Sequence, residues 1–311
     1  MKKNSNKLFH PTDIVFKDDA RHRTGFFSHV ETWYYDAMFE NGYSIVSLVN
    51  VIHIGKIGTV LSGIFFYKDG KLLKICRQRY PLRHFSGSED TLLLKLKNKQ
   101  IIHGKIEQNG NWTYQINRGN NEYGFDLQFV KTMKPFKGQT FLGKWLVIPG
   151  FSVSGELTIN GDTMKVQGNG YHDHNIYPLK SPFITKGYFF GKIPLGNANV
   201  IWAQVQKKSE IQSLVILSET DSYTSIHPDK ILFTVEKCMD HGKNMPYSCR
   251  LQVDDSCLHL DVSFHPITYH YIGIPATNYW RYHMQYQGSY LFKTEKKSIS
   301  EIDIAEYLSF F

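Results

Sequence analysis

The chain has 311 residues, of which 41% are hydrophobic and 21% charged, a balance that fits a soluble protein of one large or two medium domains and argues against a membrane bundle or a disordered chain. Its formal net charge of +8 comes from scattered basic residues without a nucleic-acid-binding motif, so nucleic acid is not an expected partner. Six Ala stand against 21 Phe, 19 Tyr and 5 Trp, and this composition argues against a mainly helical fold because Ala is the best helix former and aromatic residues favour strands.

The N-terminus carries no sign of a secretion signal. Residues 1–7 are basic, but His10, Pro11 and Asp13 follow where an apolar segment would be needed. The four cysteines show no Cys-x-x-Cys pair, which favours unpaired thiols in a reducing compartment. We therefore expect a cytoplasmic protein.

Turn dipeptides recur along the chain and separate segments in which apolar and polar residues alternate. They are Asn41-Gly42, Asp69-Gly70, Asn109-Gly110, Asn160-Gly161 and Gly196-Asn197. The clearest predicted hairpins pair residues 31–39 with 43–52, 63–67 with 72–79, 155–159 with 164–168, and 200–206 with 211–218. Sequential hairpins are typical of antiparallel meanders, so the sequence predicts an all-β sandwich or barrel.

Residues 45–67 form an almost apolar stretch that is long enough to span a bilayer. In a spanning helix, Lys56 would lie near the midplane, and Gly55 and Gly58 would interrupt the helix between two β-branched runs. Two strands joined by a turn at these glycines explain the stretch better.

A break between two strand-rich parts is predicted just after the middle of the chain. Pro178 and Pro182 interrupt the alternating pattern there, and interruptions of this kind mark domain boundaries. We place the first domain at residues 1–178 and the second at residues 183–311.

A short helix is expected near the C-terminus. Residues 298–301 read Ser-Ile-Ser-Glu, which favours a helix start, and Ile304 with Leu308 supplies a modest apolar stripe. Such a helix would pack against the second domain.

The segment Gly-Asn-Gly-Tyr-His-Asp-His-Asn places titratable groups in what otherwise resembles a strand. Because side chains alternate along a strand, Tyr171, Asp173 and Asn175 share one face. His172 and His174 share the other face. If the first face lines an apolar barrel interior, burial keeps Asp173 protonated near neutral pH, and the residue can then donate a proton.

The His-x-His spacing also fits a metal site, because it places two imidazoles side by side on one strand face. Such a site needs a third and a fourth ligand, and nothing in the sequence ties His270 or His283 to this strand. A structural hydrogen-bonding role for His172 and His174 is the simpler interpretation. We therefore expect neither a metal nor any other cofactor.

Two further strands carry candidate substrate-binding residues. Alternation places Glu31, Trp33 and Tyr35 on one face, where a carboxylate beside aromatic rings can orient a neighbour or stabilise a cation. Ordinary core packing around one hydrogen-bonded Glu is the alternative. Trp280 and Tyr282 alternate in the same way near the C-terminus, where they either fill a barrel or form one wall of a pocket.

Four stretches of the sequence carry a resemblance to known proteins. They are Asp19-Ala20-Arg21-His22, then Glu31-x-Trp33-Tyr34 followed by Gly42, then Trp145, and Gly170-Tyr171-His172-Asp173-His174-Asn175. Together they resemble the hydroxyneurosporene synthase (carotenoid hydratase) superfamily, whose relatives include AttH-like proteins and lipocalin-like Diels–Alderases. The resemblance implies two lipocalin-like antiparallel β-barrels in tandem and a hydrophobic pocket for polyenes or isoprenoids. It also implies that Tyr171 and Asp173 protonate a carbon–carbon double bond, with help from Trp145.

These observations lead to a leading hypothesis about function. Protonating an alkene produces a carbocation, so the site needs an acid, aromatic faces and exclusion of stray water. We expect Asp173 to be the acid, Tyr171 and Asn175 to be its partners, and Trp33 and Trp145 to face the cation. The enzyme would then be a hydratase, if water captures the cation, or a cyclase, if another double bond of the substrate does.

Two alternatives remain open. A pericyclase would fold a linear polyene into its reactive conformation without acid catalysis. A carrier of lipids or isoprenoids would bind the same molecules without chemistry. In each case the expected partner is an apolar small molecule, and the basic excess adds peripheral membrane contact as an expectation.

Overall fold

The computed structural model describes residues 9–22, 27–207, 210–274 and 277–310, and the chain divides into two compact units. The N-terminal unit consists of Thr12–Gly138 and Gly143–Lys180. The C-terminal unit runs from Ser181 onward and includes Gln139–Leu142 and residues 9–11. Neither unit is therefore one continuous stretch of chain.

Strands make up nearly all of the regular structure. The strands of the N-terminal sheet are β1 (Ser28–Phe39), β2 (Tyr43–Ile54), β3 (Ile57–Lys68), β4 (Lys71–Pro81), β5 (Phe85–Gly87), β6 (Leu93–Leu96), β7 (Lys99–Ile106), β8 (Trp112–Gly119), β9 (Tyr123–Lys131), β10 (Phe136–Gln139), β11 (Lys144–Ile159) and β12 (Asp162–Pro178). Those of the C-terminal sheet are β13 (Gly187–Pro194), β14 (Asn199–Lys207), β15 (Glu210–Ser218), β16 (Tyr223–Ser225), β17 (Ile231–Asp240), β18 (Lys243–Asp255), β19 (Leu258–Ile274), β20 (Thr277–Phe292) and β21 (Glu295–Phe310). Short 3₁₀ turns are η1 (Phe16–Asp19), η2 (Leu82–His84), η3 (Ser181–Phe183) and η4 (Pro228–Lys230).

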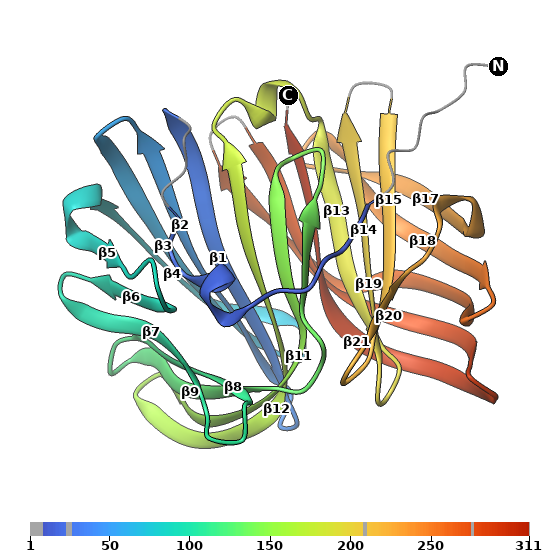
Figure 1. The fold of residues 1–311 in the computed structure, drawn as a ribbon, viewed down its shortest axis with the longest axis horizontal. Helices are drawn as coiled ribbons and strands as arrows, with labels where there is room; N and C mark the ends of the chain where they lie inside the picture. The colour runs from blue at the N-terminus through green and yellow to red at the C-terminus, as the bar shows by residue number, and fades with distance from the viewer. Residues whose placement is uncertain (1–8, 23–26, 208–209, 275–276, 311) are drawn as a thin grey trace. The chain divides into compact units, whose positions relative to one another are not determined.

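Both units are antiparallel meanders built on the same plan (Figure 1). The N-terminal sheet has the strand order β4-β3-β2-β1-β12-β11-β9-β8-β7-β6-β5, with β10 paired to β11, and the C-terminal sheet has the order β16-β15-β14-β13-β21-β20-β19-β18-β17. In each sheet the first strand pairs with the last, β1 with β12 and β13 with β21. One sheet is a nearly closed barrel and the other is curved, so the prediction of an all-β fold with two tandem lipocalin-like barrels is confirmed.

The hairpins predicted from the turn dipeptides are present as β1–β2, β3–β4, β11–β12 and β14–β15. The apolar stretch of residues 45–67 is divided between β2 and β3. Gly55 in the turn between them has φ +59°, a left-handed conformation that glycine adopts without steric cost. Within the described residues, no helix combines the length and the apolar character that crossing a membrane requires.

The prediction of a C-terminal helix is wrong. The residues in question belong to β21, which pairs with β20 from Glu295 to Phe310 and with β13 near its end. The β-branched residues Ile299, Ile302 and Ile304 suit a strand, and pairing on two sides outweighs a weak helix-start pattern in a short segment.

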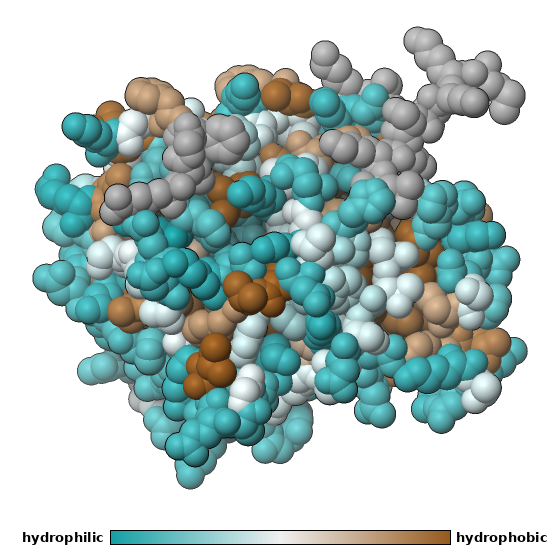
Figure 2. All heavy atoms as spheres, in the orientation of Figure 1, coloured by the Kyte–Doolittle hydropathy of each residue, from teal (hydrophilic) through white to brown (hydrophobic). Residues whose placement is uncertain are grey.

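Alternation along the strands builds one hydrophobic core in each unit. Trp33 and Tyr35 of β1 point into the N-terminal core, and Trp280 and Tyr282 of β20 point into the C-terminal core. Figure 2 shows one face of the molecule, where hydrophilic side chains cover most of the surface and hydrophobic ones form small separate patches. Many of the aromatic residues therefore lie inside the two sheets, because every second side chain of a strand points to the same face.

Candidate functional site

The strand β12 lies between β1 and β11, and its two faces have different surroundings. Residues that pair directly across an antiparallel ladder share a face. His172 pairs with Tyr35, and His174 pairs with Trp33, so both histidines point to the core of the N-terminal unit. Asp173 belongs to the opposite face, which we call the outer face.

The expectation that Asp173 lines the barrel interior is therefore wrong. The core face of β12 receives the two imidazoles instead, because they share that face with the buried aromatic residues of β1. The outer face is nevertheless dry at this point, since Asp173 has only 7% of its surface exposed and Tyr171 has 0%.

Three side chains hold the carboxyl group of Asp173. Tyr171 Oη donates a hydrogen bond to Asp173 Oδ2 at 3.0 Å, and Asn175 Nδ2 donates to Oδ1 at 2.7 Å. Trp145 Nε1 donates to Oδ2 at 3.3 Å from the neighbouring strand β11. We call these four residues the Asp173 cluster. The sequence placed three of them together by alternation along one strand, and the ladder between β11 and β12 adds the fourth.

The two carboxyl oxygens of Asp173 differ in the kinds of hydrogen-bond partner that they have. Asn175 can serve Oδ1 only as a donor in this geometry, whereas the Tyr171 hydroxyl can donate to Oδ2 or accept from it. A proton on Asp173 would therefore reside on Oδ2, with Tyr171 as its hydrogen-bond acceptor. The indole of Trp145 packs edge-on against Phe136, with ring centroids 6.1 Å apart, so its position is set by packing as well as by the hydrogen bond.

The core face carries a second set of titratable groups, which we call the polar core cluster. Its members are Asp19, His22, Glu31, His172 and His174. His174 lies between two carboxylates, with Nε2 3.0 Å from Glu31 Oε1 and Nδ1 3.2 Å from Asp19 Oδ1. The second contact is an ion pair that lacks the alignment of a hydrogen bond. His172 lies between Asp19 and the backbone of Tyr34. Its Nε2 is 3.0 Å from Asp19 Oδ1, and its Nδ1 is 2.7 Å from the carbonyl oxygen of Tyr34.

The polar core cluster is charged although it is buried. Burial alone would raise the pKa of Asp19, but the charges of His172 and His174 and the hydrogen bond from His172 outweigh it and lower that pKa to about 2. Burial opposes ionisation of Glu31 as well, and hydrogen bonds from His174 and His22 lower its pKa to about 2. The two carboxylates in turn overcome the effect of burial on His174 and raise its pKa to about 9.

Aromatic rings fix the orientation of the two buried imidazoles. Trp33 stacks on His174 with ring centroids 4.4 Å apart, and Tyr35 stacks on His172 at 4.0 Å. The sequence grouped Glu31 with these two aromatic residues as a substrate-binding face. In the structure all three are fully buried on the core face. Trp33 therefore lies on the opposite face of the sheet from Asp173, and the expectation that it faces a cation formed at Asp173 is wrong. A role of the three residues in binding substrate stays a prediction.

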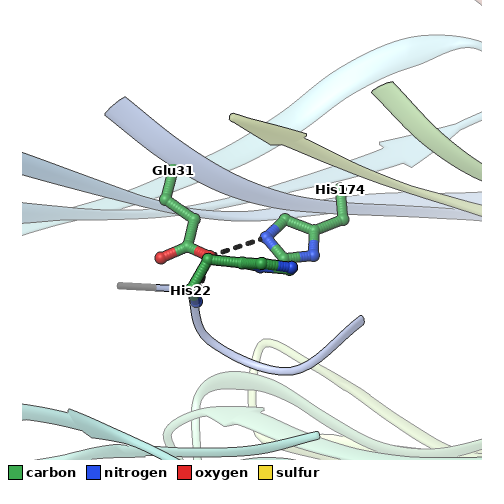
Figure 3. A group of neighbouring side chains, drawn as sticks. All are labelled: His22, Glu31 and His174. Carbon is green, nitrogen blue, oxygen red and sulfur yellow. Dashed lines mark hydrogen bonds and ion pairs between the residues drawn. The ribbon is translucent and has the colours of Figure 1, made fainter. Parts of the chain in front are cut away.

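Three atoms of the polar core cluster converge as metal ligands would. The ligand-type atoms of His22, Glu31 and His174 all lie within 4.8 Å of one another, and Figure 3 shows the three side chains turned toward one point from the segment after η1, from β1 and from β12. The sequence suggested His172 as the second histidine of a metal site, but its nitrogens face Asp19 and a backbone carbonyl. Sequence reasoning missed the contribution of His22, whose only signal was its place in the Asp-Ala-Arg-His motif.

The C-terminal unit buries charges on the corresponding strands β13, β20 and β21. Arg281 Nε donates to Glu306 Oε1 at 2.9 Å, and Lys192 Nζ lies 2.8 Å from Asp303 Oδ1. Burial, together with the positive charges of Arg281 and Lys192, lowers the pKa of His283 to about 3. This group is therefore a neutral imidazole near two ion pairs.

Trp280 and Tyr282, the other predicted substrate-binding residues, are fully buried in the C-terminal core. The indole nitrogen of Trp280 donates to the carboxylate of Asp240 at 2.7 Å. Among the described residues, the hydroxyl of Tyr282 has no hydrogen-bond partner. Both rings fill the interior of their sheet, and their role in binding substrate stays a prediction.

Comparison with known proteins gives the fold. No protein-family model and no curated protein matches the sequence. Among solved structures, an AttH-like protein from Nitrosomonas europaea has a TM-score of 0.69 at 13% identity, with 95% of this chain and 96% of that chain covered. Kievitone hydratase from Nectria haematococca has a TM-score of 0.64 at 12% identity, with 99% and 94% covered. CghA, solved with Sch210972, has a TM-score of 0.62 at 12% identity, with 91% and 89% covered. These structures match the group of proteins that the sequence motifs resemble, and at such identities the likeness concerns the fold.

Proposed function

We propose that the chain is an enzyme that protonates a carbon–carbon double bond of an apolar substrate, with Asp173 as the acid. The observation that carries the proposal is the Asp173 cluster, in which one nearly buried carboxyl group is held by Tyr171, Asn175 and Trp145. The fold shared with kievitone hydratase supports the same class of reaction.

Each member of the cluster has a separate task in this proposal. Asn175 holds Oδ1 as an acceptor and so fixes the plane of the carboxyl group. Tyr171 accepts a hydrogen bond from the protonated Oδ2 and donates one to the carboxylate after the proton has left, because a hydroxyl group can do both. Trp145 donates its indole N–H to Oδ2 from the neighbouring strand and so holds this oxygen beside Tyr171.

The reaction balances without any group other than water. Asp173 transfers its proton to one alkene carbon, and the second alkene carbon becomes a cation. Water then adds to the cation, and the proton that it loses returns to Asp173, so that one molecule of water is consumed for each alcohol formed. In a cyclase, a second double bond of the same substrate attacks the cation, and a proton is lost from carbon to the carboxylate.

The substrate class in the proposal is a long isoprenoid or polyene. Such a molecule can form the tertiary or allylic cation that makes protonation by a carboxylic acid feasible. We place the enzyme in the cytoplasm, where its four free cysteines suit a reducing environment. The net charge of +8 favours peripheral contact with anionic membranes that store apolar substrates, which flotation with anionic vesicles would detect.

Turnover in deuterated water tests the proposal. The enzyme is incubated with candidate prenylated and polyene substrates in D₂O, and the products are analysed by mass spectrometry. A hydratase places one deuterium on carbon and adds the elements of water, whereas a cyclase adds deuterium without water. Asp173→Asn should abolish turnover and leave ligand binding and the circular dichroism spectrum unchanged.

The same experiment identifies the alternatives. A pericyclase would convert a linear polyene without taking up deuterium, because positioning replaces proton transfer. A carrier would return the ligand chemically unchanged after long incubation. Full activity in the Asp173→Asn variant would exclude the proposed role of Asp173.

A further inference from the structure

The geometry of the polar core cluster points to a second site on the opposite face of β12. We propose that His22, Glu31 and His174 bind a divalent transition-metal ion of the Zn²⁺ class. This site is independent of the proposed reaction at Asp173, because its ligands lie on the core face and the acid lies on the outer face.

The donor set and its spacing fit such an ion. Glu31 Oε1 lies 3.0 Å from His174 Nε2 and 3.2 Å from His22 Nδ1. Ligands bound to one tetrahedral Zn²⁺ at about 2.0–2.2 Å are separated by roughly 3.3–3.6 Å. Small movements of three side chains would therefore place an ion among them, and imidazole with carboxylate is a common donor set for Zn²⁺.

The groups behind the ligands are those that metal-bound histidines usually have. If His174 binds the ion through Nε2, its Nδ1 faces the carboxylate of Asp19 at 3.2 Å. Asp19 is held in turn by His172, and Trp33 stacks on the imidazole of His174. A carboxylate that accepts the other ring N–H of a ligating histidine fixes its tautomer and its ring plane, and Asp19 lies within reach of that role.

The second carboxylate oxygen of Glu31 is left without a hydrogen-bond partner among the described residues. Among the described residues, Glu31 Oε2 is buried and accepts no hydrogen bond, although buried carboxylate oxygens are normally satisfied. A metal ion, or a water molecule bound to it, would supply the missing interaction. The ion would also lie close to the buried carboxylate of Asp19, which faces His174 at 3.2 Å.

The site has a route of entry and an open position. The side chain of His22 is 32% exposed, whereas those of Glu31 and His174 are 0% and 1% exposed, so an ion would enter past His22. Three protein ligands leave one tetrahedral position for water. Binding would tie the segment after η1 to β1 and β12, and it should therefore stabilise the N-terminal unit.

Metal titration of the full chain tests this proposal. Tag-free protein treated with a chelator and desalted is titrated with Zn²⁺ by calorimetry and with Co²⁺ by visible absorption. We expect one equivalent of each metal to bind, with a tetrahedral Co²⁺ spectrum, and we expect Zn²⁺ to raise the melting temperature, because a ligand of the native state stabilises it. Absence of stoichiometric binding overturns the proposal.

Variants locate the ion. His22→Gln removes the most exposed ligand without opening the core, and it should weaken binding by at least about tenfold. Glu31→Gln should weaken binding as well and serves as the second ligand variant. His259→Gln is the control, because His259 Nδ1 lies 2.8 Å from Asp254 Oδ1 in an exposed pair that could hold a metal only at the surface. Unchanged affinity in His22→Gln, or loss of binding in His259→Gln, overturns the proposal.

Discussion

The carboxyl group of Asp173 and the imidazole of His174 belong to consecutive residues of β12 but lie on opposite faces of the N-terminal sheet. Asp173 is held by Tyr171, Asn175 and Trp145, whereas His174 lies between two buried carboxylates. One strand therefore carries two polar clusters, one on each of its faces. Substitutions in the two clusters can be distinguished by their effects, because those in the Asp173 cluster should change turnover and those in the polar core cluster should change stability.

The hydroxyl group of Tyr171 should matter for turnover. Tyr171→Phe keeps the buried ring and removes the donor to Asp173 Oδ2. A hydrogen bond to a charged group contributes about 1.5–3 kcal/mol, or roughly tenfold to a hundredfold in rate if it acts in the transition state. We expect a loss of that size in kcat/KM on whichever substrate the deuterium experiment identifies.

Tyr34→Phe is the matched control for this prediction. Tyr34 lies opposite Asp173 in the ladder, packs edge-on against Tyr171 with centroids 6.2 Å apart, and donates its hydroxyl to Asp36 at 3.2 Å. Its replacement removes a buried hydroxyl from the same sheet face that donates to Asp36 rather than to the acid. Equal losses of activity in both variants would show that Tyr171 has no special relation to Asp173.

Asp19 should be essential for the stability of the N-terminal unit. Asp19→Asn keeps the shape of the side chain but removes the charge that faces His172 and His174. Because breaking a buried ion pair leaves an uncompensated charge, we expect the free energy of unfolding to fall by about 3–5 kcal/mol. Urea unfolding followed by circular dichroism would measure the change.

The comparison for Asp19 is Asp90, which pairs with Lys17 at 2.6 Å on the surface. Asp90→Asn removes a carboxylate from an ion pair that is shorter than those of Asp19 but exposed to solvent, where water screens the interaction. We expect its urea midpoint to match that of the wild type. A similar midpoint for Asp19→Asn would contradict the role assigned to the polar core cluster.

The strands of the fold could be predicted from the sequence because local patterns specify them. The alternation of residues 31–39 and 43–52, with Asn41-Gly42 between them, is sufficient for the β1–β2 hairpin. The C-terminal helix was predicted wrongly, since the conformation of β21 is decided by pairing with β20 and β13. The second of these partners lies about a hundred residues earlier in the chain. Propensity in a short segment yields to tertiary pairing of this extent.

The site was predictable only within one strand. Alternation along β12 separates Asp173 from His174, but both faces of this strand carry polar residues, so the pattern does not tell which face is the core. The ladder with β1 decides it, by placing His174 opposite Trp33. The contribution of His22 depends on the path of an irregular segment, which has no periodicity to interpret.

His283 should make the C-terminal unit sensitive to acid. Its pKa in the folded protein is about 3, below its ordinary value of 6.5, because of burial and the charges of Arg281 and Lys192. Between these two values the unfolded chain binds a proton that the folded chain does not, so stability falls as the pH drops from about 6.5 toward 3. The carboxylates of Asp303 and Glu306 keep their partners Lys192 and Arg281 charged and in place.

The test for His283 compares two stability profiles. His283→Gln removes the titrating ring, so the free energy of unfolding of the variant should depend less on pH between 6.5 and 4.5 than that of the wild type. Carboxylates affect both proteins alike in this interval, and the difference between the profiles isolates the histidine. Parallel profiles would show that the folded protein protonates His283 as readily as the unfolded chain does.

Breaking the buried pair of Arg281 and Glu306 should lower the free energy of unfolding strongly, whereas replacing both residues with apolar ones should lower it much less. Arg281 Nε donates to Glu306 Oε1 at 2.9 Å, and Nη2 donates to the hydroxyl of Tyr279 at 2.6 Å. Arg281→Leu or Glu306→Leu alone leaves a buried charge unpaired, which costs about 3–5 kcal/mol. The double replacement leaves no unpaired charge and fills the space with apolar side chains, so it should recover most of that loss. Urea unfolding of the wild type, both single variants and the double variant gives the coupling energy, and additive losses would mean that the two side chains stabilise the C-terminal unit independently of each other.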